Sequence, residues 1–524
     1  LSGFATPSRR TFVVPGLPKL NPGLKLANTF GVNPQGNPSF HLKTGRIRAA
    51  TKYKTKNTKH KAQSTVPDRS ASMTNLNQLS LTELVTLIRG KQVSSVQVAE
   101  SFIAQIESRN PTLNAIATLN PRLLDHAKAA DSQLARGEAL GLLHGVPISV
   151  KDTIETAGLR TTSGSLIRAD YVPDTDAPAV GLLKNAGALI LGKTNAAEMA
   201  MDYNADNPVF GRTYHPLSNR LTPGGSSGGE AVAIATYMSP AGIGSDLAGS
   251  IRIPAHFCGI AGLKPGTNVV PGEGQYPPST GPYSLGAAIG PLARNVADLT
   301  LLFHALTHSN VELDHRDVAG VCIAWYGSDG AIPVSDETEL ALKTTAQVLK
   351  SAGFQCSEQV PPNVQRGNEL WLKLFSRASV VQLRKAYDGR EDVGGAFVSW
   401  RLKNADSPPP PTLDQYISDW MERDRAREEL LRWMEKTPVI LAPVGATPAF
   451  EHDSLKLRVR DVDVGTFRAF GYAQAFNVFD LPVVTVPVGK SEKGLPIGVQ
   501  IVGRPKEELK ILRIAAILER ELSQ

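Results

Sequence analysis

The chain has 524 residues, of which 41% are hydrophobic and 20% are charged, proportions that are typical of a globular enzyme. It contains no run of 18 apolar residues, so the sequence predicts no membrane-spanning segment. The net charge of +7 is unevenly distributed, because residues 1–72 hold 13 of the 56 lysines and arginines but only one of the 49 acidic residues, Asp68. The basic character therefore belongs to the N-terminal tail, and the remainder of the chain is mildly acidic.

Residues 1–72 are rich in Pro, Gly, Asn and Lys and lack hydrophobic periodicity, which predicts a disordered basic extension. Met73 opens a stretch that resembles a natural start, so residues 73–524 are predicted to form the folded domain and the tail to be an upstream extension. Two alternatives remain open. A cleaved organelle transit peptide is favoured by the scarcity of acidic residues, and a nucleic-acid-binding arm by the lysines at positions 52–61.

The three cysteines, Cys258, Cys322 and Cys356, are odd in number, widely spaced and free of CxxC pairing. They indicate a reducing compartment, which favours the cytoplasm, and no zinc site.

Two amphipathic helices are expected first along the chain. Ser80 with Glu83, and Ser94 with Gln97, have the spacing of capping boxes, in which a hydroxyl and an acid or amide side chain satisfy free backbone N–H groups at a helix start. Apolar residues at helical spacing follow each box. A third helix is predicted within residues 121–136.

From Lys151 onward, short apolar runs alternate with helical patterns, which is typical of an α/β fold with a sheet covered by helices. A polar, helical insertion over the site is expected at residues 366–436. The predicted strands are residues 188–191, 320–325, 354–359, 439–443, 483–487 and 497–502, and the predicted helices are residues 179–186, 231–238, 337–352 and 507–522.

Residues 224–265 contain two serine clusters surrounded by glycine. Glycine lets backbone N–H groups converge on one developing negative charge, as an oxyanion hole requires. Leu247, Ala248, Gly249 and Ser250 offer four adjacent backbone donors, and the hydroxyl of Ser250 could attack. Neither His215 nor His256 lies in a recognisable motif, whereas Lys151 ends a short apolar run where burial would lower its pKa and leave a neutral amine as the base.

Three separated motifs carry a family resemblance: GVPISVKD at residues 145–152, TPGGSSGGE at 222–230 and GSDLAGSIRIPAHFCGIAGLKP at 244–265. In this order they resemble the amidase signature family of Ser-Ser-Lys hydrolases, from about residue 80 to the C-terminus. The resemblance implies a single large mixed sheet with helices on both faces. It also implies hydrolysis of a small-molecule amide to an acid plus ammonia or an amine, with no metal and no cofactor. A homodimer is left open.

The same resemblance assigns roles to individual residues. It implies Ser250 as the acylated nucleophile, Ser226 after a cis peptide bond as the bridging serine, and Lys151 as the base. It further implies an oxyanion hole at residues 247–250. Family members usually carry two glycines before the nucleophile where this chain has Ala248 and Gly249, so the hole is expected to survive if φ of Ala248 stays negative.

Further residues are implied as supports or as pocket walls. Ser227 is the neighbour with which Ser226 could be confused, and Asp246 and Arg252 form either a structural ion pair or a solvated pair worth under about 1 kcal/mol. The segment with Met199, Ala200 and Tyr203 resembles the family stretch that lines the acyl pocket, and helix packing is the alternative explanation. These residues complete the set of expected site positions.

Two other functions remain open within or beside this family. The glutaminase subunit of tRNA-dependent amidotransferases shares the triad, but it tends to have Gln where this chain has Ile253 and Tyr-Gly-Arg where it has residues 266–268, Gly-Thr-Asn. The basic tail favours nucleic-acid binding as the third hypothesis, at most as an added property.

Two local patterns match unrelated motifs. Residues 187–194 satisfy the phosphate-loop pattern GxxxxGKT, but the variable positions Ala-Leu-Ile-Leu predict a buried strand and not a phosphate-binding loop. Residues 224–228 match the GxSxG elbow of α/β-hydrolases, which needs a preceding strand and a downstream histidine. No strand is predicted at residues 221–223, although His452 keeps that interpretation open.

Overall fold

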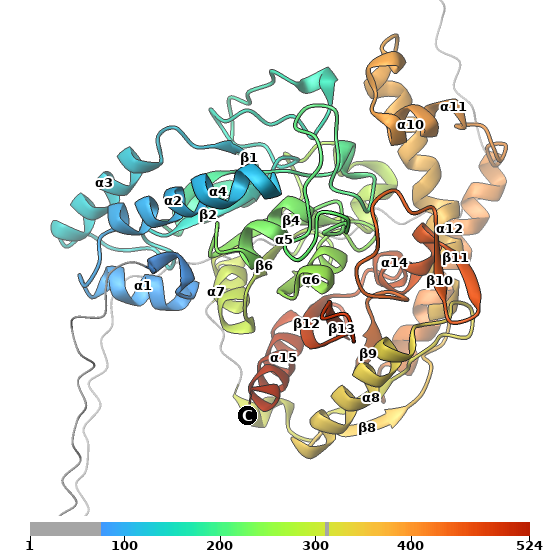
Figure 1. The fold of residues 1–524 in the computed structure, drawn as a ribbon. Coiled ribbons are helices and arrows are strands. Elements are labelled where there is room, and N and C mark those ends of the chain that lie inside the picture. The colour runs from blue at the N-terminus through green and yellow to red at the C-terminus, as the bar shows by residue number, and fades with distance from the viewer. Residues whose placement is uncertain (1–74, 310–313, 524) are drawn as a thin grey trace, which may run out of the picture. The chain divides into compact units, whose positions relative to one another are not determined.

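The computed structural model describes residues 75–309 and 314–523 (Figure 1). The predicted disordered extension at residues 1–72 lies outside the described residues, and so do its alternatives as a transit peptide or a nucleic-acid-binding arm. None of the described helices has the length and apolar character needed to cross a bilayer.

The centre of the fold is a mixed sheet of eleven strands in the order β1-β3-β2-β4-β6-β5-β12-β13-β9-β7-β8. Strand β2 runs parallel to β3 and β4, and β7 runs parallel to β8 and β9, whereas the other neighbours are antiparallel. The predicted mixed sheet is therefore confirmed. Its strands are β1 (Ile116–Leu119), β2 (Pro147–Lys151), β3 (Leu189–Thr194), β4 (Ala241–Asp246), β5 (Ala261–Lys264), β6 (Ala288–Ala293), β7 (Cys322–Trp325), β8 (Gln355–Glu358), β9 (Val439–Pro443), β12 (Val483–Lys490) and β13 (Pro496–Val502). A separate hairpin consists of β10 (Lys456–Val459) and β11 (Val462–Gly465).

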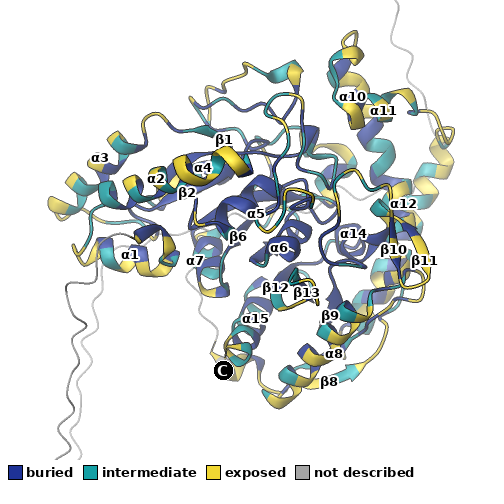
Figure 2. Cartoon of the chain, viewed as in Figure 1, coloured by how far each residue is buried: buried dark blue, intermediate teal, exposed yellow. Residues whose placement is uncertain are grey.

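Helices cover both faces of the sheet, with their apolar sides buried and their polar sides exposed (Figure 2). Because side chains alternate between the faces of a strand, Val439 and Leu441 of β9 enter one core and Ile440 and Ala442 the other. The helices are α1 (Leu81–Arg89), α2 (Ser95–Leu113), α3 (Leu123–Ala135), α4 (Pro178–Asn185), α5 (Gly228–Ala235), α6 (Arg252–Cys258), α7 (Val296–Thr307), α8 (Asp336–Ser351), α9 (Gly367–Trp371), α10 (Arg377–Tyr387), α11 (Ala396–Lys403), α12 (Leu413–Trp433), α13 (Thr466–Ala469), α14 (Gly471–Val478) and α15 (Glu508–Leu522). Helices α1, α2, α7, α8 and α15 contribute to the first core, and α9, α12 and α14 to the second.

Most of the predicted elements are present, with shifted ends. Both capping boxes are formed, at Ser80 with Glu83 and at Ser94 with Gln97. The helix expected at residues 231–238 begins three residues earlier, and strand β3 extends to Thr194. Strands β4, β5 and β6 were not predicted, because their glycines have low strand propensity. In β4, Gly242 lies where the carboxylate of Glu230 fills the space that a side chain would need.

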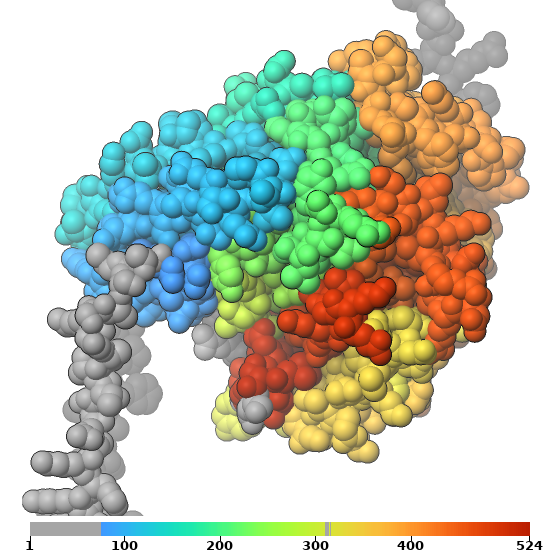
Figure 3. Space-filling view, in the orientation of Figure 1, coloured from blue at the N-terminus to red at the C-terminus, as the bar shows by residue number. Residues whose placement is uncertain are grey.

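The helical segment from α9 to α12 forms the expected insertion. Its surface adjoins that of preceding segments of the chain in the space-filling view (Figure 3). Contacts along this boundary include Gln382 Nε2, which donates to the carbonyl of Pro278 at 3.0 Å, and Tyr387, whose hydroxyl donates to the buried carboxylate of Glu198 at 2.6 Å. Ala197, next to Glu198, donates its N–H to the carbonyl of Ser226 at 3.2 Å, so this part of the insertion is attached close to the first serine cluster.

Candidate active site

Lys151 is the last residue of β2, and its side chain is completely buried. Its Nζ atom lies 2.6 Å from Ser226 Oγ and 3.0 Å from Ser245 Oγ. Removal from water lowers the pKa of Lys151 to about 7, and the negative charges of Asp246 and Glu230 only partly oppose this shift. A substantial fraction of the amine is therefore neutral near pH 7 and able to accept a proton.

The first serine cluster leads into the N-terminus of α5. Ser226 and Ser227 are both buried, and the peptide bond between Gly225 and Ser226 is cis. Gly225 packs so closely against the backbone of residues 202–203 that no side chain would fit there. The hydroxyl of Ser227 donates to the carbonyl of Ser245 at 3.4 Å. The two neighbouring serines therefore differ, because the first contacts the lysine and the second contacts strand β4.

The second serine cluster is a turn between β4 and α6. Gly249 has a φ of 101°, a conformation that favours glycine, and an added Cβ would lie 2.7 Å from a methyl carbon of Ile253. Ala248 is not among the residues with positive φ, so the condition set for it from the sequence is met. Ser227 N donates to the carbonyl of Ser250 at 3.2 Å. This bond brings the two clusters together.

The amide hydrogens of this turn have different partners. Gly249 N–H donates to a carboxylate oxygen of Asp246 at 2.9 Å. The N–H groups of Leu247, Ala248 and Ser250 have no hydrogen-bond acceptor among the described residues. These three donors are therefore free to bind an incoming oxygen atom.

A buried ion pair holds the turn in place. Arg252 donates from Nε and Nη2 to both carboxylate oxygens of Asp246, at 3.0 and 2.9 Å, and both side chains are completely buried. Asp246 also accepts Ile251 N–H at 3.0 Å. Burial alone would raise the pKa of Asp246, but the charge and hydrogen bonds of Arg252 hold it well below its usual range. The solvated-pair interpretation is therefore wrong.

Replacing Asp246 with asparagine is expected to lower the free energy of unfolding by about 3–5 kcal/mol, because Arg252 would remain buried without its counter-charge. Urea denaturation of the variant measures this loss. Asp453→Asn is the matched control, since it breaks an ion pair with Arg212 in which the aspartate is 68% exposed, and it should cost under about 1 kcal/mol. Equal losses in the two variants would contradict the stabilising role of the buried pair.

A buried acid, Glu230, influences the pKa of Lys151, and its role was not predicted from the sequence. Glu230, in the first turn of α5, accepts hydrogen bonds from Ser149 and, at 2.7 Å, from Thr194. Burial raises its pKa to about 7 despite these bonds. The sequence feature that could have indicated this residue is an acidic position directly after the GGSSGG motif. Ser245, the second neighbour of the lysine amine, has no comparable signal, because only the order of the strands brings it there.

The phosphate-loop pattern at residues 187–194 does not form a phosphate site. Residues 189–194 are the fully buried strand β3. The Nζ atom of Lys193 donates to the carbonyl of Ile154 and, at 2.9 Å, to the hydroxyl of Thr156. The lysine is occupied inside the protein, as expected for a buried strand.

The three histidines considered as bases, His215, His256 and His452, contact other parts of the protein. His215 Nε2 lies 2.9 Å from the carbonyl of Phe257, and His256 Nδ1 accepts Gly498 N–H at 2.7 Å. Leu221 forms only an isolated bridge, to Glu451, so no strand precedes the first serine cluster. The elbow interpretation therefore lacks its strand, and His452 packs against Tyr214 with ring centroids 6.0 Å apart.

The expected pocket residues have different environments. Met199 is 1% exposed and packs with Leu383, Tyr387 and Val398 of the insertion, as the packing alternative anticipated. Met199 and Ala200 both have positive φ. Tyr203 is buried, and its hydroxyl donates to the carbonyl of Ala248 at 2.7 Å. Of the three, Tyr203 is the residue that contacts the turn at residues 247–250.

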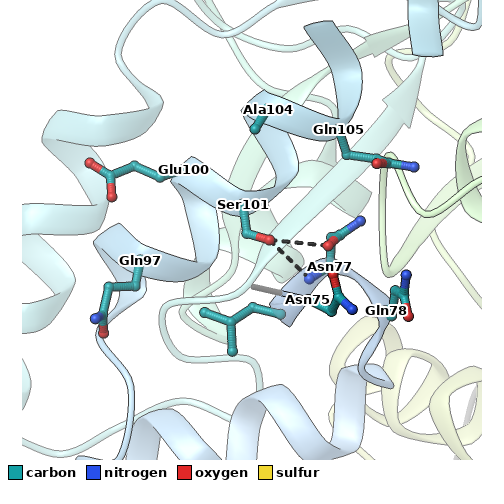
Figure 4. A pocket seen from close by; sticks show the side chains of 9 residues that line it. Asn75, Asn77, Gln78, Gln97, Glu100, Ser101, Ala104 and Gln105 are labelled. Atoms are coloured by element: carbon teal, nitrogen blue, oxygen red, sulfur yellow. Dashed lines mark hydrogen bonds between the residues drawn. The ribbon is translucent and has the colours of Figure 1, made fainter. Parts of the chain in front are cut away.

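A polar groove lies elsewhere, beside α2 (Figure 4). Ser101 and Asn77 are joined across it by two hydrogen bonds of 3.1 and 3.2 Å, and Gln105 and Glu100 also line it. The groove contains no residue of the serine clusters. Within residues 75–309 and 314–523, no group of three or more His, Cys, Asp or Glu side chains is arranged to hold a metal ion.

Comparison with known proteins assigns the family. The amidase family model matches residues 97–512. The chain belongs to the amidase signature family. This amidase is 33% identical to the indoleacetamide hydrolase of Bradyrhizobium diazoefficiens, over 84% of the chain and 86% of that protein. It is 31% identical to one of the subunits of the glutamyl-tRNA(Gln) amidotransferase of Carboxydothermus hydrogenoformans, over 85% and 97% of the two chains. The crystal structure of an amidase superposes with a TM-score of 0.77 at 27% identity, covering 84% of this chain and 99% of that one. The protein is a hydrolase that acts on amide C–N bonds.

Proposed function

We propose that this amidase cleaves its amide through an acyl-enzyme on Ser250, with Ser226 as the proton relay and Lys151 as the base. The observation that carries the proposal is the 2.6 Å contact between a fully buried lysine amine and Ser226 Oγ. Neutral Lys151 takes the proton of Ser226 while Ser226 takes that of Ser250, and Ser250 Oγ bonds to the amide carbon. The relay then returns a proton to the leaving nitrogen as the C–N bond breaks. Water then attacks the acyl carbon and gives its proton to the relay. The relay returns a proton to Ser250 Oγ as the acid leaves.

The oxyanion of the tetrahedral intermediate is proposed to lie against the turn at residues 247–250. The free N–H groups of Leu247, Ala248 and Ser250 are the donors best suited to it, because Gly249 N–H is already bonded to Asp246. Preorganised donors of this kind stabilise charge that develops only in the transition state. In this proposal Asp246, Arg252 and Ser227 keep the turn in place and do not react.

The glutaminase subunit of a tRNA-dependent amidotransferase is the second candidate, since amidotransferase subunits are among the relatives. It is disfavoured by Ile253 and by residues 266–268, which depart from the pattern expected of those subunits. Ammonia release from amides by the isolated chain, without tRNA or other proteins, would support the free-standing amidase. Activity confined to glutamine and dependent on tRNA would reverse this choice.

A panel of primary amides of graded acyl length, including aryl and indole acyl groups, would identify the preferred substrate, with ammonia release as the measurement. Tyr203 and Trp371, which bond to the turn at residues 247–250, pack together on the ring of Phe467, so we propose an apolar acyl group. The three unpaired cysteines support a reducing compartment such as the cytoplasm.

Activity is expected to fall as the pH is lowered through 7. Burial lowers the pKa of Lys151 to about 7, so the neutral base predominates above that pH and the inactive ammonium below it. The rate constant kcat/KM should therefore drop about tenfold per pH unit on the acid side. Glu230→Gln removes a carboxyl group whose negative charge favours the ammonium form. Because burial raises the pKa of Glu230 to about 7, that charge is only partly present in this range, and the fall in activity should move only slightly to lower pH. If kcat/KM of the variant falls over the same pH range as that of the wild type, this electrostatic coupling is contradicted.

A further inference from the structure

Three successive peptide carbonyls at the nucleophile turn each accept a hydrogen bond from a side chain that lies far away in the sequence. The carbonyl of Asp246 accepts from Asn477 Nδ2 at 3.3 Å, that of Leu247 from Trp371 Nε1 at 2.8 Å, and that of Ala248 from Tyr203 Oη at 2.7 Å. Trp371 is the last residue of α9, in the insertion. The backbone of the turn is therefore held from outside by three different elements.

The orientation of a carbonyl determines that of the amide hydrogen in the same peptide group. A trans peptide unit is planar, so C=O and N–H point in opposite directions. The Leu247 carbonyl shares its peptide group with Ala248 N–H, one of the free donors of the turn. When Trp371 holds this carbonyl on one side, Ala248 N–H is directed to the other, and the bond to the carbonyl also polarises the N–H group.

Tyr203 acts on the next peptide group. Its bond to the Ala248 carbonyl directs Gly249 N–H toward Asp246, where that hydrogen is bound. Gln474 links Tyr203 to α9, the helix that ends with Trp371. Its Nε2 donates to Tyr203 Oη at 3.0 Å, and its Oε1 accepts from Asn368 of α9 at 2.7 Å. Tyr203 and Trp371 also pack on the same ring, Phe467, with centroid distances of 5.4 and 4.9 Å.

We propose that Trp371 and Tyr203 are positioning residues for catalysis. Trp371 orients and polarises Ala248 N–H, a donor that receives the oxyanion, and Tyr203 fixes the next peptide group, whose N–H is bound by Asp246, so that the turn keeps the shape the oxyanion needs. The proposal rests on the proposed function of the turn. It gives the insertion a catalytic role, since without Trp371 the donor at Ala248 would lose the bond that fixes its peptide plane. The substrate need not touch Trp371 for this effect.

The test is Trp371→Phe, which keeps an aromatic ring and removes the indole N–H. With the best amide from the acyl panel, kcat is expected to fall about tenfold, less than the 100-fold or more for deleting an oxyanion donor itself, while KM changes less than twofold. A boronic acid with the same acyl side chain adds to the nucleophile as a tetrahedral anion, and its inhibition constant should rise about tenfold. The corresponding primary alcohol forms no such anion, and its binding should be unchanged.

Tyr203→Phe is the second variant and should show the same selective loss for kcat and the boronic acid. Tyr416→Phe is the matched control, because this phenol also donates to a carbonyl, that of Leu374 at 3.1 Å, but within the insertion and away from the turn. It should leave every constant within twofold. The proposal is overturned if the Trp371 and Tyr203 variants keep full kcat and boronic acid affinity, or if they lose alcohol binding to the same extent. Full turnover by Ser250→Ala would instead overturn the proposed function on which it rests.

Discussion

Ser250→Ala is expected to reduce kcat for amide hydrolysis by roughly 10⁶-fold, the scale of the loss when the nucleophile of a serine hydrolase is removed. The loss should appear in kcat, because the hydroxyl is needed to form the acyl-enzyme and contributes little to binding of the amide. The side chain is small and 6% exposed, so its removal leaves the turn and the ion pair beneath it intact. Ammonia release and covalent labelling by a serine-reactive phosphonate measure the effect.

Ser227→Ala is the informative control, because Ser227 is also a buried serine in a glycine-rich cluster. Its hydroxyl donates to the carbonyl of Ser245 and does not contact the lysine amine. This variant should still be labelled and should lose no more than about tenfold in rate, the scale of one lost hydrogen bond. Persistence of the label on Ser250→Ala would refute the assignment of the nucleophile.

Lys151→Met is expected to lower kcat/KM by about 10³–10⁴-fold, near the upper range of general acid–base catalysis. Methionine is unbranched and apolar, so it can occupy the buried channel of the lysine side chain, and the cost of burying a charge disappears. The variant should therefore fold with a thermal midpoint close to that of the wild type. The residual activity should also no longer fall as the pH is lowered through 7.

Lys264→Met provides a matched control. Lys264 likewise ends a fully buried strand, and burial lowers its pKa to about 8, but its Nζ donates to the carbonyl of Pro265 and contacts neither serine cluster. A loss of less than about tenfold is expected there, the scale of one hydrogen bond. Comparable losses in both lysine variants would indicate that burial of a lysine, and not proton transfer, explains the effect of Lys151→Met.

Much of the site was predictable because its signals are local. The apolar run before Lys151, the glycines around both serines and the order of the three motifs can all be recognised along the chain. The capping boxes at Ser80 and Ser94 are equally local, since each depends on residues three positions apart. Glycine at position 249 belongs to the same class, because its positive φ is a property of one residue.

The sequence alone determined the family and the α/β class, and it supplied the candidate catalytic residues, because these follow from short patterns of residue type. Only the tertiary structure decided their partners. Lys151 meets Ser226 75 residues away, Arg252 is buried by its contacts with Gln500 and Asn477, and Trp371 bonds to Leu247 across 124 residues. Such contacts depend on the order of strands in the sheet, in which β2 lies beside β4 and β5 beside β12. Periodicity defines which face of a strand is buried, but it carries no information on which strand becomes its neighbour.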